Sequence, residues 1–87
     1  MPRISFFYGI VITMYWRERE HPVPHFHASY ADQEASVALD GTILGGSLPS
    51  RALRLVRQWA RLHREELLAN WHRARVYQPL ESIEPLS

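Results

Sequence analysis

The chain contains no cysteine and no lysine, and each absence limits what it can do. Without cysteine there is no disulfide framework and no metal site with thiolate ligands. Without lysine, all ten basic residues are arginine, a bias that GC-rich codon usage explains most simply. The charges nearly cancel, at a formal net charge of +1, so the chain as a whole does not look like a general binder of polyanions.

A long apolar run and a secretory signal are also missing. No apolar stretch approaches the ~18 residues that a membrane-spanning helix needs. The apolar segment that follows Met1–Ser5 ends at the charged residues 17–20, so the basic, apolar and small regions of a signal peptide do not follow one another. We therefore expect a cytoplasmic protein that is not bound to a membrane.

The chain does contain enough apolar side chains for one folded domain. Its 87 residues are 46% hydrophobic and include three Trp, four Tyr and three Phe. This composition is typical of a globular chain and argues against disorder of the whole sequence. Because there is no repeat, no low-complexity tract and no linker, residues 1–87 are expected to form a single domain.

The first half of the chain predicts a small antiparallel sheet of three to four strands within residues ~4–44. Residues 6–16 are rich in aromatic and β-branched side chains on both alternating sets, which is typical of a central strand, here with a bend at Gly9. Asp40-Gly41 is a strong hairpin signal. Loops or turns separate the remaining strands, which we expect at 25–30, 34–40 and 42–44.

The second half predicts a C-terminal helix, or a kinked pair of helices, over residues ~49–75. Ser47 or Ser50 is expected to cap it, with Pro49 in the first turn. The apolar stripe then moves by about a quarter-turn at ~100° per residue, which predicts a kink or break near His63–Glu66. The two apolar sets are Ala52, Leu55, Val56, Trp59 and Leu62, and then Leu67, Leu68 and Trp71.

Residues 78–87 predict an extended tail. Apolar Ile83 and Leu86 are spaced by Glu84 and Pro85, so the tail can dock on its own sheet edge or add a strand to the sheet of a partner. Strands followed by a helix predict an α+β fold in which the helix covers one face of the sheet.

Three of the five histidines lie in the segment His21-Pro22-Val23-Pro24-His25-Phe26-His27. Both prolines favour extended backbone in the residue before them. In an extended strand, side chains two residues apart share a face, so His25 and His27 are expected side by side, with Phe26 opposite.

Three interpretations of this pair stay open. In the first, His25 and His27 are candidate catalytic residues that act as general acid and base, as in small ribonucleases, without a cofactor. In the second, they ligate a metal such as zinc, with His21 or His63 as a possible further ligand. In the third, one imidazole packs under the helix and the other is merely exposed.

The charges are segregated along the chain. Residues 49–64 hold five arginines and no acid, whereas residues 31–48 hold three acids and no base. On a helix, Arg54, Arg57, Arg61 and Arg64 fall on the side opposite Trp59. Because cations near a helix N-terminus oppose its dipole, this face is a candidate binding site for an anionic partner, either a protein or RNA. The simpler alternative is a solvated face in an arginine-biased chain.

The ordered motifs of the chain also form a recognisable set. Its opening residues are Pro2-x-Ile4-Ser5-x-Phe7-Tyr8-Gly9-Ile10-x-Ile12-x-Met14-Tyr15, followed by Pro24-His25-Phe26-His27-Ala28. The later ones are Gly46-x-Leu48-Pro49, Trp59, His63, Glu66-Leu67, Asn70-Trp71 and Ile83-Glu84-Pro85-Leu86. Over nearly its whole length the chain therefore resembles a small bacterial family, domain of unknown function 4160.

The resemblance implies a short single-domain protein that is often encoded beside a member of family 2442, in an arrangement similar to toxin–antitoxin pairs. It implies no activity and no catalytic residue. We expect a component of such a two-gene module that binds the protein product of the adjacent gene, and RNA as a second partner, with a candidate RNA-cleaving site at the histidines. The alternatives are a metal- or ligand-binding protein and a non-catalytic interaction module, the antitoxin of the pair.

Overall fold

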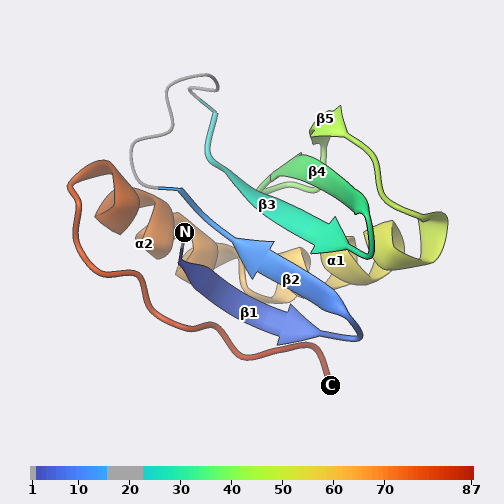
Figure 1. Ribbon diagram of the computed structural model, residues 1–87. Helices are drawn as coiled ribbons and strands as arrows, with labels where there is room; N and C mark the ends of the chain where they lie inside the picture. The colour runs from blue at the N-terminus through green and yellow to red at the C-terminus, as the bar shows by residue number, and fades with distance from the viewer. Residues whose placement is uncertain (1, 16–22) are drawn as a thin grey trace.

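The protein has an α+β fold, in which a five-stranded antiparallel sheet is followed by two helices (Figure 1). A computed structural model describes residues 2–15 and 23–87. The strands follow one another across the sheet in the order of the sequence. They are β1 (Arg3–Phe7), β2 (Ile10–Thr13), β3 (His25–Tyr30), β4 (Gln33–Ala38) and β5 (Ile43–Gly46). The predicted fold class is confirmed, with one strand more than the three to four expected.

The additional strand arises at the N-terminus, where the prediction of one central strand over residues 6–16 is wrong. The chain reverses at Tyr8-Gly9, whose φ angles of 51° and 80° are both left-handed. Two consecutive residues of this kind make a tight hairpin turn, and Phe7 pairs directly with Ile10. The apolar run is therefore folded back on itself as β1 and β2, while Trp16 lies outside the described residues.

The other strands lie close to where the pattern placed them, although β4 ends at Ala38 and not at residue 40, and β5 continues to Gly46 and not only to residue 44. β3 matches the predicted 25–30 segment, and the chain turns at Ala31-Asp32 into β4. Along β4, Ala35 and Val37 are buried while Glu34 is exposed, as the alternation predicts. The Asp40-Gly41 hairpin is confirmed too, and the amide of Ala38 donates to the carbonyl of Thr42 at 2.8 Å to close it.

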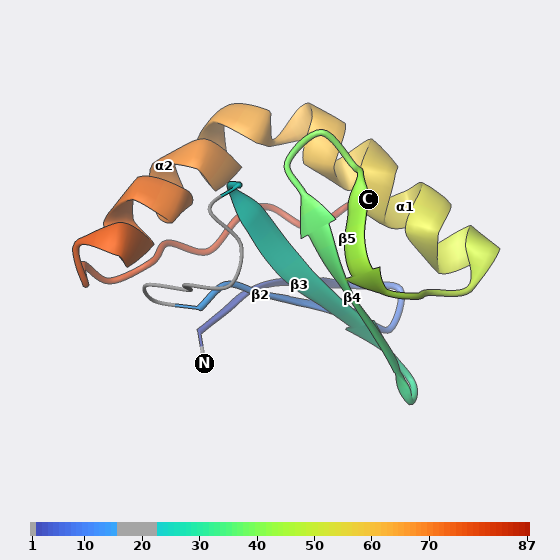
Figure 2. The same ribbon diagram turned by 90° about the horizontal axis from the view of Figure 1, so that it is seen from above.

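The two helices, α1 (Ser50–Leu62) and α2 (Arg64–Arg75), cover one face of the sheet (Figure 2). They meet at His63, which confirms the predicted break. The predicted serine cap is wrong, because Pro49 is the N-cap residue of α1 and no side chain caps it. Trp59 is the centre of the core and packs against Phe7 and Phe26 at ring-centroid distances of 5.3 and 5.7 Å. Within the described residues, no helix is long and apolar enough to cross a membrane.

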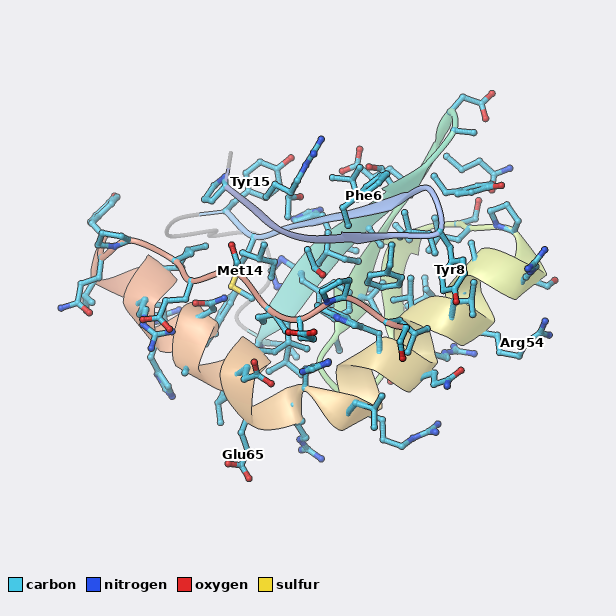
Figure 3. The ribbon with its side chains drawn as sticks, turned by 90° about the horizontal axis from the view of Figure 1, so that it is seen from below. Phe6, Tyr8, Met14, Tyr15, Arg54 and Glu65 are labelled. Carbon is cyan, nitrogen blue, oxygen red and sulfur yellow. The ribbon has the colours of Figure 1, made fainter. Side chains whose placement is uncertain are left out.

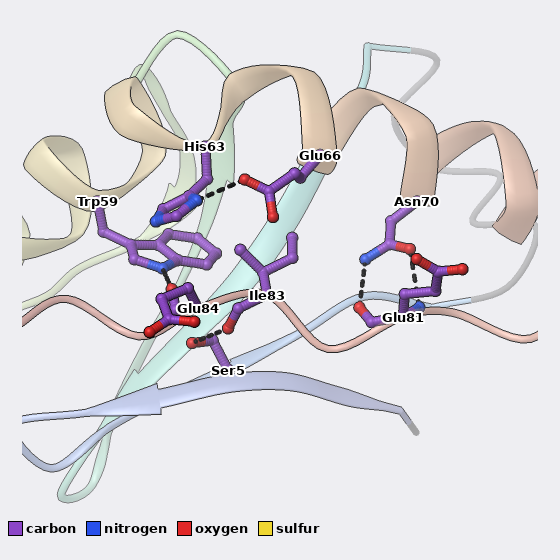
Figure 4. A network of polar contacts seen from close by, with 8 residues as sticks. All are labelled: Ser5, Trp59, His63, Glu66, Asn70, Glu81, Ile83 and Glu84. Carbon is purple, nitrogen blue, oxygen red and sulfur yellow. Dashed lines mark hydrogen bonds and ion pairs between the residues drawn. The ribbon is translucent and has the colours of Figure 1, made fainter.

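The tail runs back along β1 and under the helices (Figures 1 and 4). Ile83 donates its amide to the carbonyl of Ile4 at 2.8 Å, and Ser5 donates its hydroxyl to the carbonyl of Ile83 at 3.0 Å. The indole of Trp59 donates to the carbonyl of Glu84 at 2.9 Å. Of the two predicted alternatives, the tail therefore takes the first and docks on its own sheet edge.

Candidate functional site

His25 and His27 lie side by side at the start of β3, as the period of two predicts. Their ring centroids are 5.3 Å apart. Phe26, between them in sequence, points to the opposite face and packs on Trp59. The strand register places His27 between Thr13 of β2 and Ser36 of β4. The strand thus brings the predicted pair together on the side opposite Phe26, and at the end of β3 the helix α2 reaches this side as well.

The two imidazoles have different environments. His25 is only 1% exposed, and its ring packs on the indole of Trp71 in α2 at 5.2 Å. Its Nδ1 lies 2.8 Å from the carbonyl oxygen of Val23. Since a carbonyl can only accept, Nδ1 carries the proton of this hydrogen bond. His25 therefore has a packing role like that of the third interpretation, and a ligand reaches it only if the surrounding side chains move.

His27 keeps a small exposed area and has polar neighbours. Its side chain is 13% exposed, and its Nδ1 lies 3.3 Å from the hydroxyl of Ser36 and 3.6 Å from a carboxylate oxygen of Glu34. The ring also meets Tyr15 edge-on, at a centroid distance of 4.4 Å. An imidazole beside a carboxylate and a hydroxyl is a set of groups that general acid–base catalysis uses.

Of the further metal ligands predicted, the described residues include only His63, which is not grouped with this pair. His63 lies at the break between the helices, where its Nδ1 is 2.6 Å from a carboxylate oxygen of Glu66 and its ring lies near that of Trp59 (Figure 4). His21 lies outside the described residues. Among the residues that are described, no group of three or more His, Asp or Glu side chains is arranged to hold a metal ion. The zinc interpretation thus stays a prediction.

The predicted arginine face is largely assembled. Arg54, Arg57 and Arg61 are exposed on α1 and line one shallow depression. We call these three residues the Arg face. Arg57 is anchored, because its Nε donates to the carbonyl of Gly41 at 2.9 Å. Arg64, the fourth predicted member, belongs to α2 and lines a different depression beside Asp40.

Asp40, which lines the same depression as Arg64, has a lowered pKa. Its pKa is lowered chiefly because the backbone N–H of Thr42 donates to it at 2.9 Å, with further contributions from the Thr42 hydroxyl and the charge of Arg64. The acidic and basic segments of the sequence therefore meet at the β4–β5 turn.

Comparison with known proteins identifies a family. The family described as "Domain of unknown function (DUF4160)" matches residues 9–72, well over half of the chain. The chain belongs to the DUF4160 family. A search of the curated proteins and a search of the solved structures each found no match. The matched segment of this DUF4160 protein contains both histidines of the pair and the whole Arg face, whereas β1 and the tail lie outside it.

The DUF4160 protein also has a pocket that the sequence did not predict. It lies between the β1–β2 turn and the first turns of α1 and is lined by Tyr8, Tyr30 and Arg51, with Ile10 and Leu55 at its base. The pocket was missed because residues 6–16 look like one continuous strand. The available signal was Gly9, a residue that permits a reversal as well as a bend.

Proposed function

We propose that this DUF4160 protein is a component of a two-gene, toxin–antitoxin-like module in the cytoplasm, and that the Arg face binds an acidic surface on the protein encoded beside it. The observation that carries the proposal is the arrangement of Arg54, Arg57 and Arg61 on one exposed helix face. Among the described residues, none of these guanidinium groups has a carboxylate within 4.0 Å. An anionic partner would supply the missing charge.

The electrostatics of α1 by itself do not account for the whole of this face. The first turn of the helix has no acidic residue and no side-chain cap. None of the three arginines of the Arg face lies in that turn, and Arg61 lies in the last turn, where a cation interacts favourably with the helix dipole by roughly 0.3–1 kcal/mol. The three side chains follow one another at spacings of three and four residues, however, so their like charges repel. The helix is held instead by its apolar side, where Val56 and Trp59 are fully buried. A role in binding therefore accounts for the arginines better than a role in folding.

The test is co-purification of the adjacent gene product with tagged protein. The double variant Arg54→Gln/Arg61→Gln is expected to lose the partner and to weaken the dependence of binding on salt, because two charges are removed while Arg57 keeps its bond to Gly41. Arg75→Gln, which removes an exposed arginine from α2, is the matched control and is expected to bind normally. Equal recovery of the partner with all three proteins would rule out the Arg face.

RNA cleavage at His27 is the second candidate function. It is favoured by the imidazole of His27 lying near the carboxylate of Glu34 and the hydroxyl of Ser36. In this proposal His27 moves the proton, and the reaction uses no metal.

Expression of the chain alone is the test of this second function. If the site is catalytic, we expect expression to arrest growth and the purified protein to cleave RNA in vitro in the presence of a metal chelator. His27→Ala should abolish both effects. His72→Ala changes an exposed histidine of α2 and is the matched control. If the wild-type chain neither arrests growth nor cleaves RNA, the catalytic proposal fails, and a non-catalytic interaction module remains.

A further inference from the structure

The pocket beside the β1–β2 turn has the size of a single ring. Its volume is about 180 Å³, and its base is formed by apolar residues such as Ile10, Ala52 and Leu55. A water molecule needs about 10–15 Å³ of such space, whereas sites for a whole small molecule usually measure ~300–1,000 Å³. The pocket is therefore suited to one ring of a longer ligand.

Tyr8 lies at the rim of this pocket, although its backbone conformation is unfavourable for a tyrosine. At φ 51° it occupies a left-handed turn position that Asn, Asp or Gly normally fills. Its side chain is 56% exposed, so burial does not compensate for the backbone strain. Figure 3 shows Tyr8 at the end of the hairpin, directed toward the first turns of α1. An exposed ring held at a strained position beside a pocket indicates that the ring is used for binding.

Tyr30 also lines the pocket, and its ring lies against a glycine. It pairs with Ile10 across β2 and β3, and its ring lies over Gly9. A Cβ at Gly9 would lie 3.2 Å from Cε1 of Tyr30, so only a glycine lets this ring lie so close to the turn. Two tyrosine rings thus border the same small space, a lining on which a flat aromatic group can stack.

Arg51 adds a positive charge at the same rim. It is exposed in the first turn of α1, and no ion pair involves it among the described residues. Arg54 follows one turn later, about 4.5 Å further along the helix axis. A site of aromatic rings with cations beside it matches a base joined to its phosphate, because an aromatic amino acid side chain would bring a ring without the anion.

We propose that this pocket binds an unpaired base of single-stranded RNA, stacked on Tyr8 and Tyr30, with the adjoining phosphate on Arg51. The inference goes beyond the proposed function, since it assigns a ligand to a pocket that adjoins the Arg face but contains none of its three arginines. A free mononucleotide is not the expected ligand, because its single ring and phosphate would use none of the cations further along α1.

The experiment measures fluorescence anisotropy of a labelled eight-nucleotide RNA, at low salt and across a salt series. Tyr8→Asn is the decisive variant, because Asn suits the turn and only the ring is lost. We expect it to bind roughly tenfold more weakly at an unchanged or higher Tm. Arg51→Gln is expected to weaken binding and to reduce the salt slope by about one.

Tyr77→Asn is the matched control. Tyr77 is another exposed tyrosine with a left-handed φ, of 59°, but it follows α2 and is not part of the pocket. We expect RNA binding by this variant to equal that of the wild-type protein. An equal loss in Tyr8→Asn and Tyr77→Asn would overturn the proposal, as would wild-type affinity in Tyr8→Asn.

Three further outcomes distinguish this pocket from the Arg face. If Arg54→Gln/Arg61→Gln abolishes RNA binding while Tyr8→Asn does not, RNA lies on the Arg face and the pocket assignment is wrong. If Tyr8→Asn releases the adjacent gene product and the wild-type protein binds no RNA, the pocket holds a protein side chain, which also overturns it. If Tyr8→Asn loses RNA but retains the protein partner, both proposals stand.

Discussion

At the scale of single residues, Asn70 shows how one buried amide fixes a segment that has no regular structure. Its Nδ2 donates to the carbonyl of Glu81 at 2.8 Å, and its Oδ1 accepts the amide of the same residue at 3.0 Å. The side chain therefore replaces a neighbouring strand for one residue of the tail. Arg73 donates to the same oxygen at 2.9 Å and holds the amide in this orientation.

Replacing this amide should destabilise the protein. Asn70→Ala leaves the backbone groups of Glu81 without their partner, and we expect the free energy of unfolding to fall by about 1–3 kcal/mol. Urea denaturation followed by circular dichroism measures the change. Ser82→Ala, at an exposed neighbouring position in the tail, is the control and should change stability by less than about 0.5 kcal/mol. Similar values for the two variants would show that the tail is held in another way.

Asp40 predicts a pH dependence at the β4–β5 turn. Its pKa is lowered in the folded protein, mainly by the hydrogen bond from the Thr42 amide, so its contribution to stability is present above the ordinary Asp value of 3.8. That contribution is lost as the pH falls through the lowered pKa, because the unfolded chain then binds the proton more readily.

The comparison of wild-type protein with Asp40→Asn tests this sign. The wild-type protein should have the higher Tm at pH 7, and the difference should shrink as the pH falls below about 4. Thermal unfolding between pH 7 and pH 3 measures it. A difference that grows toward low pH would contradict the assigned direction.

At the scale of elements, the pairing of β4 with β5 depends on a residue without a side chain at position 46. Gly46 has a left-handed φ of 73°, and a Cβ there would collide with the carbonyl oxygen of Glu34. At the preceding residue, Gly45, a Cβ would meet nothing within 4 Å. Two adjacent glycines of the same strand thus have opposite requirements.

Alanine substitution should separate these glycines. We expect Gly46→Ala to lower the free energy of unfolding by about 1–3 kcal/mol, through strain at positive φ and the displaced strand. Gly45→Ala should stay within about 0.5 kcal/mol of the wild-type protein. Chemical denaturation of both variants measures the difference, and equal effects would show that β5 is not placed as described.

The elements also show which features can be read from sequence. The strand at 25–30 and the break at His63 were predicted, because both follow from a local period that the packed structure preserves. The β1–β2 turn was missed, since Tyr8 is not a typical turn residue and the apolar pattern continues through it. The absence of a side-chain cap on α1 was not predicted either, because Ser47 and Ser50 lie near the start of the helix and both are typical cap residues.

In the candidate site, too, some features follow from a local sequence pattern and others do not. Strand periodicity was enough to place His25 beside His27. It could not show that His25 is sealed against Trp71, because that contact depends on how α2 lies across the end of the sheet. The pocket at Tyr8 and Arg51 was also out of reach, since it forms between segments more than 40 residues apart that no local pattern relates.

At the scale of the whole molecule, Trp59 joins every layer. Its ring contacts β1 and β3 through Phe7 and Phe26, and its indole N–H donates to the tail at Glu84. Because one buried side chain contacts sheet, helix and tail together, loss of any of these layers exposes the same part of the core. The molecule therefore should not release its tail as a separate step.

Equilibrium unfolding tests this cooperativity. Tryptophan fluorescence and far-ultraviolet circular dichroism should give coincident urea transitions, as expected for a two-state domain of this size. Trp59→Phe, which keeps a ring but lacks the donor to Glu84, should lower the midpoint while leaving the two transitions superimposed. A fluorescence change that precedes the loss of helix signal would indicate an independently detaching tail.

Because the tail docks on β1, the two edges of the sheet differ in how far their hydrogen-bonding groups are occupied. Hydrogen-bonding groups of β1 are already occupied by the chain itself at Ile83, whereas β5 is the outermost strand on the other side. Unpaired edge strands on both sides would allow successive copies to pair edge to edge into a fibre. Here, if two copies pair through their β5 strands, the outer edges of the combined sheet are the two β1 edges, which the tails already occupy. Strand pairing of this kind therefore ends with a dimer.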